Sequence, residues 1–461
     1  MMWFTLEEVE KVTQATLVKK RNVCFNGVAI DSRKCEKDQL FVALRGKRVD
    51  GHSFVSEALQ RGAAGVLVER MDKDIEATTF VVPNTYEALV SLGKYASLRL
   101  KGTKIGITGT AGKTTCKHLF TQLLSTRFSA AMTPQSFNTS LGVSVSFANF
   151  PEDVCFIVVE AGISERGEMD SLASIIRPEV AVFTAFGEGH LQGLGSVEGV
   201  IEEKLKLVCE NTRSVYLNVD RGVPKTEDVC LRAPRAVVIP FGMRREALLR
   251  LESFMLDVRR LRSSFSIVWD THRLSLEAPI LAPEVVLTAL PAIHFALEAG
   301  VPFEDVREVL ADFRELPGRG GFFRFGNGIV IDDTYNANPL SVRKAVDLAT
   351  RFARGGYKVC LVLGDMLELG VVAEDAHRSI LLYVERSPVD LVILFGSLFE
   401  KAFESIGGDD RRFVLVRTPE EAHAILKSFA ASSLPWVVLL KGSRGMGLEA
   451  MMLEEWREFY A

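Results

Sequence analysis

TKIGITGTAGKTT, residues 103–115, runs from an apolar strand pattern through a glycine turn into a helix start. Gly109 and Gly112 let backbone N–H groups approach an anion closely, and the start of a helix adds the positive end of its dipole. Lys113 supplies a point charge and Thr114 an oxygen ligand for Mg²⁺. The sequence therefore predicts a phosphate-binding loop and a protein that handles a nucleoside triphosphate. The predicted loop comprises Gly109, Thr110, Ala111, Gly112, Lys113, Thr114 and Thr115.

This loop departs from the usual phosphate-loop pattern in one respect. Ile107 stands five residues before Gly112, so the form is TGTxGKTT rather than GxxxxGKT. A chance GKT in an unrelated loop is the alternative interpretation, but strand, turn and helix follow one another in the order that phosphate binding requires.

Length and composition place the chain among globular proteins. Its 461 residues predict about three domains, and 48% hydrophobic with 25% charged residues excludes disorder. A net charge of −4 provides no basic field, so we expect no nucleic-acid partner. The longest uncharged stretch, residues 128–151, is too polar for a membrane span. We expect a monomer.

The cysteines and the N-terminus indicate a cellular compartment. Seven scattered cysteines form no CxxC pair, so neither a disulfide framework nor a zinc site is predicted. The N-terminus, MMWFTLEEVEKV, is acidic and amphipathic and does not resemble a signal peptide. We therefore expect a cytoplasmic protein.

Strand and helix patterns alternate along the whole chain, which predicts an α/β protein of three domains. A small N-terminal α/β domain is expected over 1–98, a central phosphate-loop ATPase-like domain over 99–312, and a C-terminal Rossmann-like domain over 313–461. In the third domain, three apolar strands end in glycine turns near residues 364, 396 and 442. Because ligands bind at the carboxyl ends of strands in open α/β sheets, we expect these turns to face a shared cleft.

A carboxylate ends the second strand of the central domain. Glu160 directly follows the apolar run 154–159, where phosphate-loop enzymes commonly hold Mg²⁺ with an acidic residue. An ordinary solvated carboxylate at a strand end is the alternative. The nearby phosphate loop favours the metal role.

A histidine and a lysine follow the next strand. His190 lies in a glycine-rich segment after the apolar run 180–183, and Ser196 is predicted to cap a helix over 196–211. Lys204 falls at the edge of the apolar stripe of this helix. Partial desolvation would favour its neutral amine, which can react with CO₂ to form a carbamate that binds metal. From helix position alone, a lysine whose stem covers apolar surface is the better interpretation.

The segment IDDTYNANP, residues 331–339, packs carboxylates, a tyrosine and carboxamides into a turn after a strand. Asp333, Tyr335 and Asn336 could contact a purine and a ribose. Turn chemistry alone also explains Asn and Pro in such a segment.

Taken together, these motifs resemble the Mur ligases, ATP-dependent amide-forming enzymes of bacterial peptidoglycan precursor synthesis. TGTAGKTT at 108–115 is similar to their phosphate loop. The similarity extends to both flanking domains and so covers the whole chain. Its further motifs are DSR at 31–33, LFVALRG at 40–46, DGH at 50–52, DDTYNANP at 332–339, GDMLELG at 364–370 and KGSR at 441–444.

The resemblance implies a role for each matching position. ATP phosphates would bind the loop around Lys113, and two Mg²⁺ ions would be held by Thr114 with Glu160 and by His190. Lys204, fourteen residues after His190, matches the carbamylated lysine of the family. The resemblance therefore favours the carbamate over a lysine whose stem only covers apolar surface. The remaining roles fall on Arg319 at the γ-phosphate, Asp333, Tyr335 and Asn336 at the nucleotide, and Ser32, Asn138 and Thr139 at the donor substrate.

The resemblance also implies partners and chemistry. The N-terminal domain would bind the UDP moiety of UDP-N-acetylmuramoyl-tripeptide, and D-alanyl-D-alanine would be the acceptor. ATP would phosphorylate the donor carboxylate, and the amine would attack the resulting acyl phosphate.

Two positions depart from the family pattern. Asn138, Thr139 and Ser140 stand where an Asn-Asn pair followed by Glu or His is usual, which puts donor contacts there in doubt. Glu284 and Val285 replace a His-Asn pair that usually touches the adenine. We therefore expect the base to be held differently and nucleotide selectivity to be looser.

Other classes of protein share part of this pattern. A nucleotide-driven switch would need the phosphate loop and Glu160, but not His190, Lys204 or Arg319. A Mur-type ligase that adds the third peptide residue, or a folate polyglutamate ligase, would differ from the expected enzyme in the YNANP loop.

Overall fold

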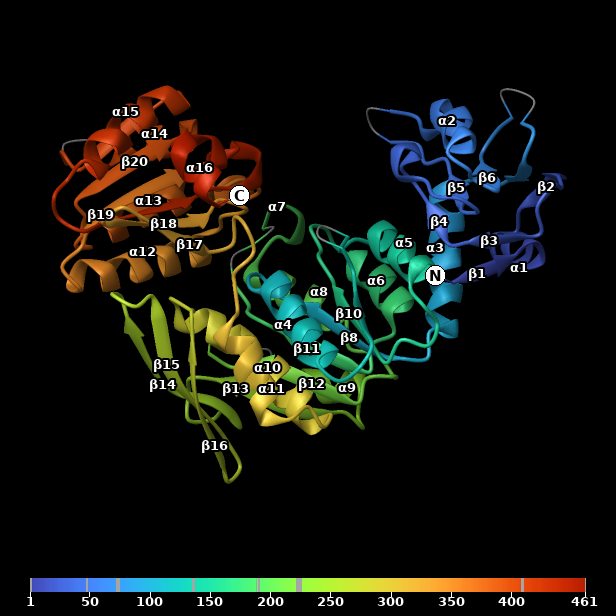
Figure 1. The fold of residues 1–461 in the computed structure, drawn as a ribbon, viewed down its shortest axis with the longest axis horizontal. Coiled ribbons are helices and arrows are strands. Elements are labelled where there is room, and N and C mark those ends of the chain that lie inside the picture. The colour runs from blue at the N-terminus through green and yellow to red at the C-terminus, as the bar shows by residue number, and fades with distance from the viewer. Residues whose placement is uncertain are drawn as a thin grey trace.

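The computed structural model describes residues 2–46, 49–71, 75–134, 137–187, 189, 191–220, 226–407 and 410–460. Three α/β parts follow one another along the chain. The N-terminal part and the C-terminal part lie at opposite ends of the molecule, and the central part lies between them (Figure 1). The α/β architecture predicted from the sequence is confirmed.

The N-terminal part is built on a five-stranded sheet with the order β2-β7-β6-β5-β4 and on the small antiparallel pair β1-β3. Strands β4 to β7 are parallel, and β2 is an antiparallel edge strand. Its elements are β1 (Trp3–Thr5), α1 (Leu6–Thr13), β2 (Thr16–Lys19), β3 (Cys24–Asn26), β4 (Val28–Ala29), β5 (Leu40–Val42), α2 (Val55–Gln60), β6 (Gly65–Val68), β7 (Thr78–Val81) and α3 (Thr85–Arg99).

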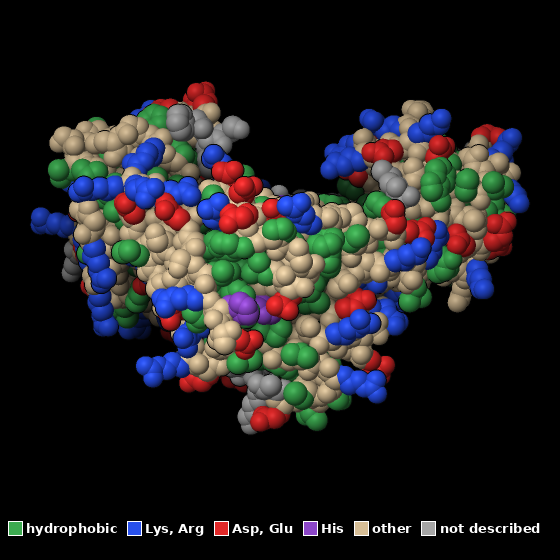
Figure 2. Space-filling model, turned by 60° about the horizontal axis from the view of Figure 1, so that its bottom comes forward, with side chains coloured by type: hydrophobic (Ala, Val, Ile, Leu, Met, Phe, Trp, Pro, Cys, Tyr) green, Lys and Arg blue, Asp and Glu red, His purple; other side chains and the backbone are tan. Residues whose placement is uncertain are grey.

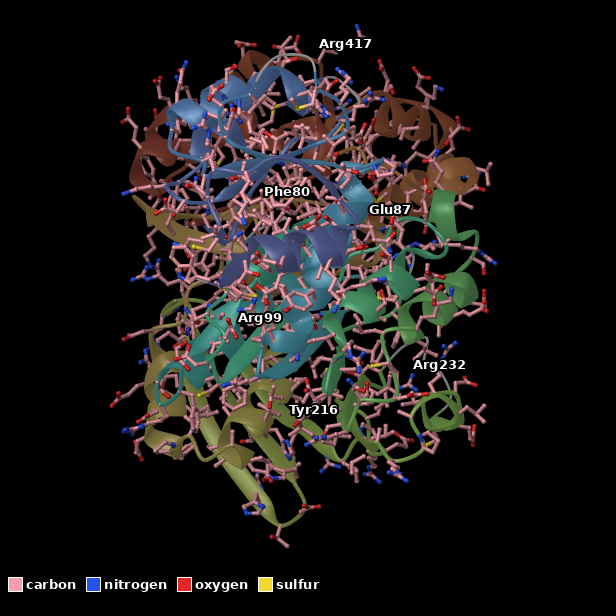
Figure 3. All side chains as sticks on the ribbon, turned by 90° about the vertical axis from the view of Figure 1, so that its right-hand side faces the viewer. Phe80, Glu87, Arg99, Tyr216, Arg232 and Arg417 are labelled. Carbon is pink, nitrogen blue, oxygen red and sulfur yellow. The ribbon has the colours of Figure 1, made fainter. Side chains whose placement is uncertain are left out.

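Helix α3 joins the N-terminal part to the central part. The buried apolar side chains of the two parts form one continuous cluster that includes Leu92, Val143 and Leu172. At the end of α3, Arg99 binds Glu8 at 3.3 Å and pairs with Glu152 of the central part. Figure 3 shows Arg99 at this junction, between Phe80 in the N-terminal part and Tyr216 in the central part.

The central part contains a nine-stranded sheet with the order β16-β15-β14-β13-β12-β11-β8-β10-β9. The pairs from β9 to β14 are parallel, as the apolar runs in the sequence predict. The strands are β8 (Thr103–Thr108), β9 (Ala130–Met132), β10 (Phe156–Glu160), β11 (Val180–Phe183), β12 (Ser214–Asn218), β13 (Val237–Gly242), β14 (Leu249–Asp257), β15 (Arg262–Trp269) and β16 (His272–Ala278). The helices are α4 (Lys113–Ser125), α5 (Ser140–Asn149), α6 (Glu168–Ile176), α7 (Leu191–Leu194), α8 (Val197–Leu205), α9 (Thr226–Arg232), α10 (Pro283–Glu298) and α11 (Phe303–Ala311).

The strand order reverses at β8, which lies between β10 and β11. The chain leaves β8 toward β9 and β10 on one side and then returns to β11 on the other. Such a reversal opens a crevice at the carboxyl ends of the strands. The phosphate loop follows β8 directly, so it lies at this crevice.

The last strands of the central sheet were not predicted from the sequence. β14, β15 and β16 pair antiparallel and extend the sheet at one edge. The hairpin tip between β14 and β15 contacts the C-terminal part, because the Tyr357 hydroxyl donates to the Val258 carbonyl at 3.4 Å. Figure 1 shows β14 and β15 reaching toward α12.

The C-terminal part has a six-stranded sheet with the order β17-β18-β22-β19-β20-β21. All neighbouring pairs are parallel except β17-β18. Its elements are β17 (Gly321–Phe325), β18 (Gly328–Asp333), α12 (Pro339–Arg354), β19 (Lys358–Gly364), α13 (Ala373–Glu385), β20 (Leu391–Phe395), α14 (Ser397–Ser405), β21 (Phe413–Val416), α15 (Pro419–Ala430), β22 (Trp436–Lys441) and α16 (Glu454–Tyr460).

The composition predicts neither a basic field nor a membrane-spanning segment. On the face shown in Figure 2, acidic and basic side chains are interspersed rather than gathered by sign. Among the described helices, none combines the length and the apolar character needed to cross a bilayer.

Candidate functional site

A cavity of about 510 Å³ lies where the central part meets the C-terminal part. The central sheet contributes the phosphate loop, Glu160 and the first turn of α10 to its walls. The C-terminal part contributes residues that follow β18 and β22, together with α12. The residues that follow Gly364 and Gly442 line this cavity, as the sequence predicts, but the turn near residue 396 does not, so that part of the prediction was wrong.

The phosphate loop has the backbone that its glycines predict. Gly112 adopts a φ of +83° and caps α4, in the left-handed region that favours glycine. A Cβ at Gly109, whose φ is +153°, would lie 2.1 Å from Thr184 Oγ1, so a larger residue would displace the loop. Lys113 Nζ donates to the Gly109 carbonyl at 2.9 Å and closes the loop.

Glu160 is the centre of a buried polar cluster beside this loop. Thr114 Oγ1 donates to Glu160 Oε2 at 2.8 Å, and Asn138 Nδ2 donates to Oε1 at 3.2 Å. Lys117, which is completely buried, places its Nζ 3.7 Å from Oε2 and donates to the Thr133 carbonyl at 2.8 Å. The hydroxyl of Thr114 and the carboxylate of Glu160 are the oxygen ligands that Mg²⁺ prefers.

Lys117 was not predicted as a site residue from the sequence, although its spacing from Lys113 could have indicated it. It follows Lys113 by four residues and therefore lies on the same face of α4. A second lysine one turn into a phosphate-loop helix adds positive charge below the loop.

Basic side chains surround Glu160 beside the phosphate loop. Burial alone would raise the pKa of the Glu160 carboxyl, but Lys113 and Lys117 hold it below its usual value. Burial lowers the pKa of Lys113, and Arg319 lowers it further. Lysine and arginine side chains beside a carboxylate suit a polyphosphate with its metal ion.

Lys204 lies deeper than the sequence predicts. Lys204 is 1% exposed, whereas its position beside the apolar stripe predicted that it lies at the edge of the buried face. Burial, together with the charge of Lys113, lowers the pKa of the Lys204 amine well below its usual range. Within the described part of the chain, Nζ has no hydrogen-bond partner. A lowered pKa favours the neutral amine, which is the form that reacts with CO₂.

The helix that carries Lys204 begins as predicted but ends early. Ser196 caps it by accepting from the Gly199 N–H at 3.1 Å, which confirms the predicted cap. The helix ends at Leu205 rather than continuing to residue 211. Glu203 of the same helix is buried and accepts from the Gly167 and Met169 N–H groups at 2.8 and 3.1 Å. Helical spacing alone could not show this, because the burial depends on α6 beginning beside it.

Arg319 enters the cavity from the segment that connects the central part to the C-terminal part. Its guanidinium lies over the Tyr335 ring, 3.9 Å from the centroid. Its Nε is buried and lacks a hydrogen-bond partner in the described structure. A cation held by stacking rather than by a carboxylate retains donors for a ligand.

Asp333 and Asn336 share one partner at the other side of the cavity. Lys441 Nζ donates to Asp333 Oδ2 at 2.5 Å and to the Asn336 carbonyl at 3.0 Å. Burial raises the pKa of Asp333, and Lys441 opposes this shift. Lys441 therefore connects the ends of β18 and β22, which neighbour each other in the sheet.

Glu315 is a site residue that the sequence did not indicate. It lies two residues before Pro317, and its Oε2 accepts from Thr115 Oγ1 at 3.5 Å. Its Oε1 is buried without a hydrogen-bond partner among the described residues. Burial and the neighbouring Asp333 raise the pKa of Glu315 to about 8. This carboxyl therefore stays protonated at neutral pH.

We expect Glu315→Gln to stabilise the protein by an amount that grows as the pH rises from about 4.5 to about 8. The pKa of Glu315 is higher in the folded protein than its ordinary value of 4.5, so folding is penalised as pH rises from about 4.5 to about 8. Glutamine stays neutral and escapes this penalty. The free energy of unfolding of the variant should exceed that of the parent by roughly 3–5 kcal/mol at pH 8.5 and by less than about 1 kcal/mol at pH 5. Urea titrations at both pH values measure this difference.

The matched control is Glu308→Gln, which changes an exposed carboxylate on α11. Its stability relative to the parent should not depend on pH. A pH-independent difference for Glu315→Gln would contradict the raised pKa.

Of the other predicted residues, Thr139 lines the cavity, Ser32 lies in the N-terminal part and His190 falls outside the described residues. Ser32 does not line the cavity, and its Oγ donates to Glu57 Oε2 at 2.7 Å in the N-terminal part. Thr139 lines the cavity and caps α5 by accepting from the Gly142 N–H at 3.4 Å. His190 lies outside the described residues. Within the described ranges, no group of three or more His, Cys, Asp and Glu side chains is arranged to hold a metal ion.

Asp365, Ser443 and Arg444 belong to the motifs GDMLELG and KGSR, and the first two are used within the C-terminal part itself. Asp365 accepts from the Leu398 and Phe399 N–H groups at 3.0 and 2.9 Å and caps the start of α14. Ser443 Oγ accepts from the Leu367 N–H at 2.9 Å. Arg444, the third such residue, pairs with Glu449 at 3.0 Å and lines the cavity.

Family models match nearly the whole chain. The Mur ligase middle domain matches residues 107–296, and the model of the Mur ligase glutamate ligase domain matches residues 318–444. The model described as the Mur ligase family catalytic domain matches residues 25–95.

Curated relatives share one name. The UDP-N-acetylmuramoyl-tripeptide–D-alanyl-D-alanine ligase of Bacillus subtilis is 31% identical over 97% of both chains. The protein of that name from Escherichia coli is 26% identical over 98% of both chains.

Solved structures show the same fold. MurF from Acinetobacter baumannii superposes with a TM-score of 0.87 at 26% identity and covers 98% of each chain. MurF from Thermotoga maritima, solved in complex with ADP, has a TM-score of 0.80 over 95% of this chain and 99% of that one at 24% identity.

Proposed function

Because this chain belongs to the Mur ligase family, we propose that it is an ATP-dependent ligase that joins D-alanyl-D-alanine to UDP-N-acetylmuramoyl-tripeptide, with formation of ADP and phosphate. One observation carries this proposal. The central and C-terminal parts converge on a single cavity that holds the phosphate loop, Glu160 and Arg319 together. A nucleotide switch would not need the C-terminal residues, so the convergence favours a ligase.

The phosphate loop binds the ATP phosphates in this proposal. The N–H groups that follow Gly109 and Gly112 donate to phosphate oxygens, and Lys113 exchanges its bond to the Gly109 carbonyl for one to the nucleotide. Thr110, Ala111 and Thr115 complete the cradle. The orphaned Nε of Arg319 supports a role in binding the γ-phosphate from the opposite wall.

Thr114 and Glu160 hold one Mg²⁺, and His190 with a carbamylated Lys204 holds a second. The burial, the lowered pKa and the missing hydrogen-bond partner of Lys204 support the carbamate. The metal ions supply Lewis acidity and charge neutralisation at the transferring phosphoryl group.

The residues of the chain perform the rest of the reaction. A donor carboxylate oxygen attacks the γ-phosphorus, ADP leaves, and an acyl phosphate forms. The acceptor amine then attacks the acyl carbon, and the tetrahedral intermediate collapses with loss of phosphate. Lys113 and Arg319 stabilise the charge that develops in the first step, and closure of the C-terminal part over the cavity would exclude water that hydrolyses the acyl phosphate.

The remaining predicted residues position the substrates. Asp333, Tyr335 and Asn336 contact the nucleotide from the C-terminal part. Asn138 and Thr139 contact the donor near the phosphate loop, and Ser32 contacts its UDP moiety in the N-terminal part. All seven cysteines are free thiols, which supports a reducing, cytoplasmic location.

We expect phosphate release from ATP to require both UDP-N-acetylmuramoyl-tripeptide and D-alanyl-D-alanine. Mass spectrometry should detect the UDP-N-acetylmuramoyl-pentapeptide in an amount equal to the ADP formed. The control reactions omit one substrate at a time, or replace the pair by UDP-N-acetylmuramoyl-dipeptide with a free diamino acid. Acceptor-independent hydrolysis would indicate a switch, and ligation of the diamino acid would indicate a third-residue ligase.

A further inference from the structure

One loop of the C-terminal part forms a piece of the cavity wall and also reaches the central part. This loop, residues 366–372, connects the end of β19 to the start of α13. Its residues Leu367 and Glu368 line the cavity. A Cβ at Gly370 would lie 3.4 Å from Gln192, so the far end of the loop touches α7. The position of loop 366–372 therefore sets the shape of one wall of the site.

A single histidine joins the two ends of loop 366–372. His377 lies on α13 and is fully buried. Its Nε2 accepts from the Met366 N–H at 2.9 Å, and its Nδ1 donates to the Ala373 carbonyl at 2.6 Å. Because one ring nitrogen accepts and the other donates, the ring is neutral with its proton on Nδ1. The Phe399 ring packs against it edge to face, with the two centroids 4.6 Å apart, and fixes its orientation.

The bond to Met366 is the one that holds the loop. Met366 is fully buried, so its N–H cannot turn to water if His377 is lost. Ala373 begins α13, and its carbonyl also accepts within the helix. Burial lowers the pKa of His377, although the Ala373 carbonyl and Asp365, 3.8 Å from Nε2, favour the charged form. The neutral ring keeps the lone pair that the Met366 N–H requires.

Loop 366–372 lies on the peptide side of the cavity. It touches α7, and α7 in turn packs on the segment that follows Glu160, because a Cβ at Gly193 would lie 2.0 Å from the Ser164 carbonyl. Ser164 lines the cavity. A Cβ at Gly162, two residues before it, would lie 2.7 Å from Asn138 Nδ2. The proposed function places the donor at Asn138, so an amine that attacks the donor's acyl carbon meets the wall that this loop forms.

We propose that His377 is a positioning residue for ligation, whose ring holds loop 366–372 in the wall that the acceptor dipeptide meets. This inference rests on the proposed function for the identity of the acceptor. Without the bond to His377, the loop loses its fixed position, and the dipeptide must order it on binding. ATP binding is spared, because the phosphate loop belongs to the central part.

Two substitutions of His377 in the full chain separate its two hydrogen bonds. The amide of His377→Gln reaches Met366 with its oxygen, whereas the shorter amide of His377→Asn reaches only Ala373. His377→Asn should raise the KM for D-alanyl-D-alanine roughly 5–20-fold, the effect of one lost hydrogen bond with a buried N–H left over. The affinity for a non-hydrolysable ATP analogue, measured by calorimetry, should change less than about twofold, and His377→Gln should stay within about threefold of the parent KM.

The matched control is His423→Asn. His423 lies on α15 in the same part of the chain, and its Nε2 donates to the Ala450 carbonyl at 2.9 Å. It does not line the cavity. This variant should keep the KM for the dipeptide and the affinity for the ATP analogue.

Hydrogen exchange followed by mass spectrometry tests the same bond without reference to activity. Peptides that span 366–372 should exchange slowly in the parent and in His377→Gln, and His377→Asn should lose protection in this segment only. Fast exchange of this segment in the parent would overturn the inference, even if a thermal melt showed that a variant had lost its fold. An unchanged dipeptide KM in His377→Asn, or a loss of ATP affinity as large as the rise in KM, would overturn it as well.

The proposed function can fail separately. If the parent does not join D-alanyl-D-alanine to the donor, the proposed function is wrong, and the role of His377 toward the dipeptide is wrong with it. If the parent ligates normally and only the His377 expectations fail, the proposed function stands.

Discussion

Lys204→Ala is expected to lower kcat for ligation by roughly 10³-fold while the protein stays folded. The variant cannot form the carbamate that we propose as a metal ligand. It leaves a buried space where the lysine stem lay, next to Lys113 and Glu160. Formate or acetate can enter this space and supply the missing carboxylate oxygens. Small carboxylates should therefore restore part of the activity, which phosphate release would measure.

Lys206→Ala is the matched control for this prediction. Lys206 lies two residues further along, and its Nζ pairs with Asp170 and Glu203 at 2.8 Å. Its loss should change kcat less than tenfold, and small carboxylates should have no effect. A purely structural role of Lys204 would be indicated if the activity were lost but could not be rescued. Normal turnover of Lys204→Ala would exclude the carbamate.

A second observable tests the carbamate without mutation. The parent enzyme incubated with ¹³C-bicarbonate should show a carbamate resonance that Lys204→Ala lacks. Removing CO₂ from the buffer should lower the activity of the parent and leave that of the formate-rescued variant unchanged.

Arg319→Ala is expected to lower kcat by roughly 10²–10⁴-fold and to weaken ATP binding much less. The phosphate loop and Lys113 hold the phosphates of the ground-state nucleotide, and the proposed nucleotide contacts of Asp333 and Asn336 remain in the variant. Arg319 contributes from the opposite wall of the cavity, where charge develops as the γ-phosphoryl group is transferred. Steady-state kinetics with calorimetric ATP binding separates the two effects.

Arg314→Ala provides the control because Arg314 is an exposed arginine in the same connecting segment. It should keep both kcat and ATP affinity. Arg319→Lys should recover only a small part of the lost rate, since lysine lacks the planar fork of donors and stacks less well on Tyr335. Equal losses of ATP affinity and kcat/KM, with kcat intact, would show that Arg319 only binds the nucleotide.

Local sequence patterns were sufficient for much of this site. The loop from Gly109 to Thr114 is contiguous, and its strand, turn and helix follow from apolar periodicity and glycine placement. Glu160 ends a strand that pairs with β8, so its position beside the loop follows from the order of a parallel sheet. The carboxyl ends of the strands that flank the cavity were predicted for the same reason.

Contacts between distant segments could not be predicted in this way. Thr115 and Glu315 are 200 residues apart in the chain, and no periodicity relates them. Glu203 is buried because α6 begins beside it, although its own helix places it on a polar face. The carboxylate of Asp365 and the hydroxyl of Ser443 are occupied by backbone N–H groups from other elements.

The sequence by itself determined the fold class, the family and the phosphate loop, because each depends on residues that are neighbours along the chain or within one helix or strand. The tertiary structure alone decided how deeply Lys204 is buried and which atoms of Arg319 and Glu315 remain without hydrogen-bond partners among the described residues. The physical reason is that pKa values and hydrogen-bond satisfaction depend on everything packed around a group. In this protein those neighbours come from two sheets that meet only after the chain has folded.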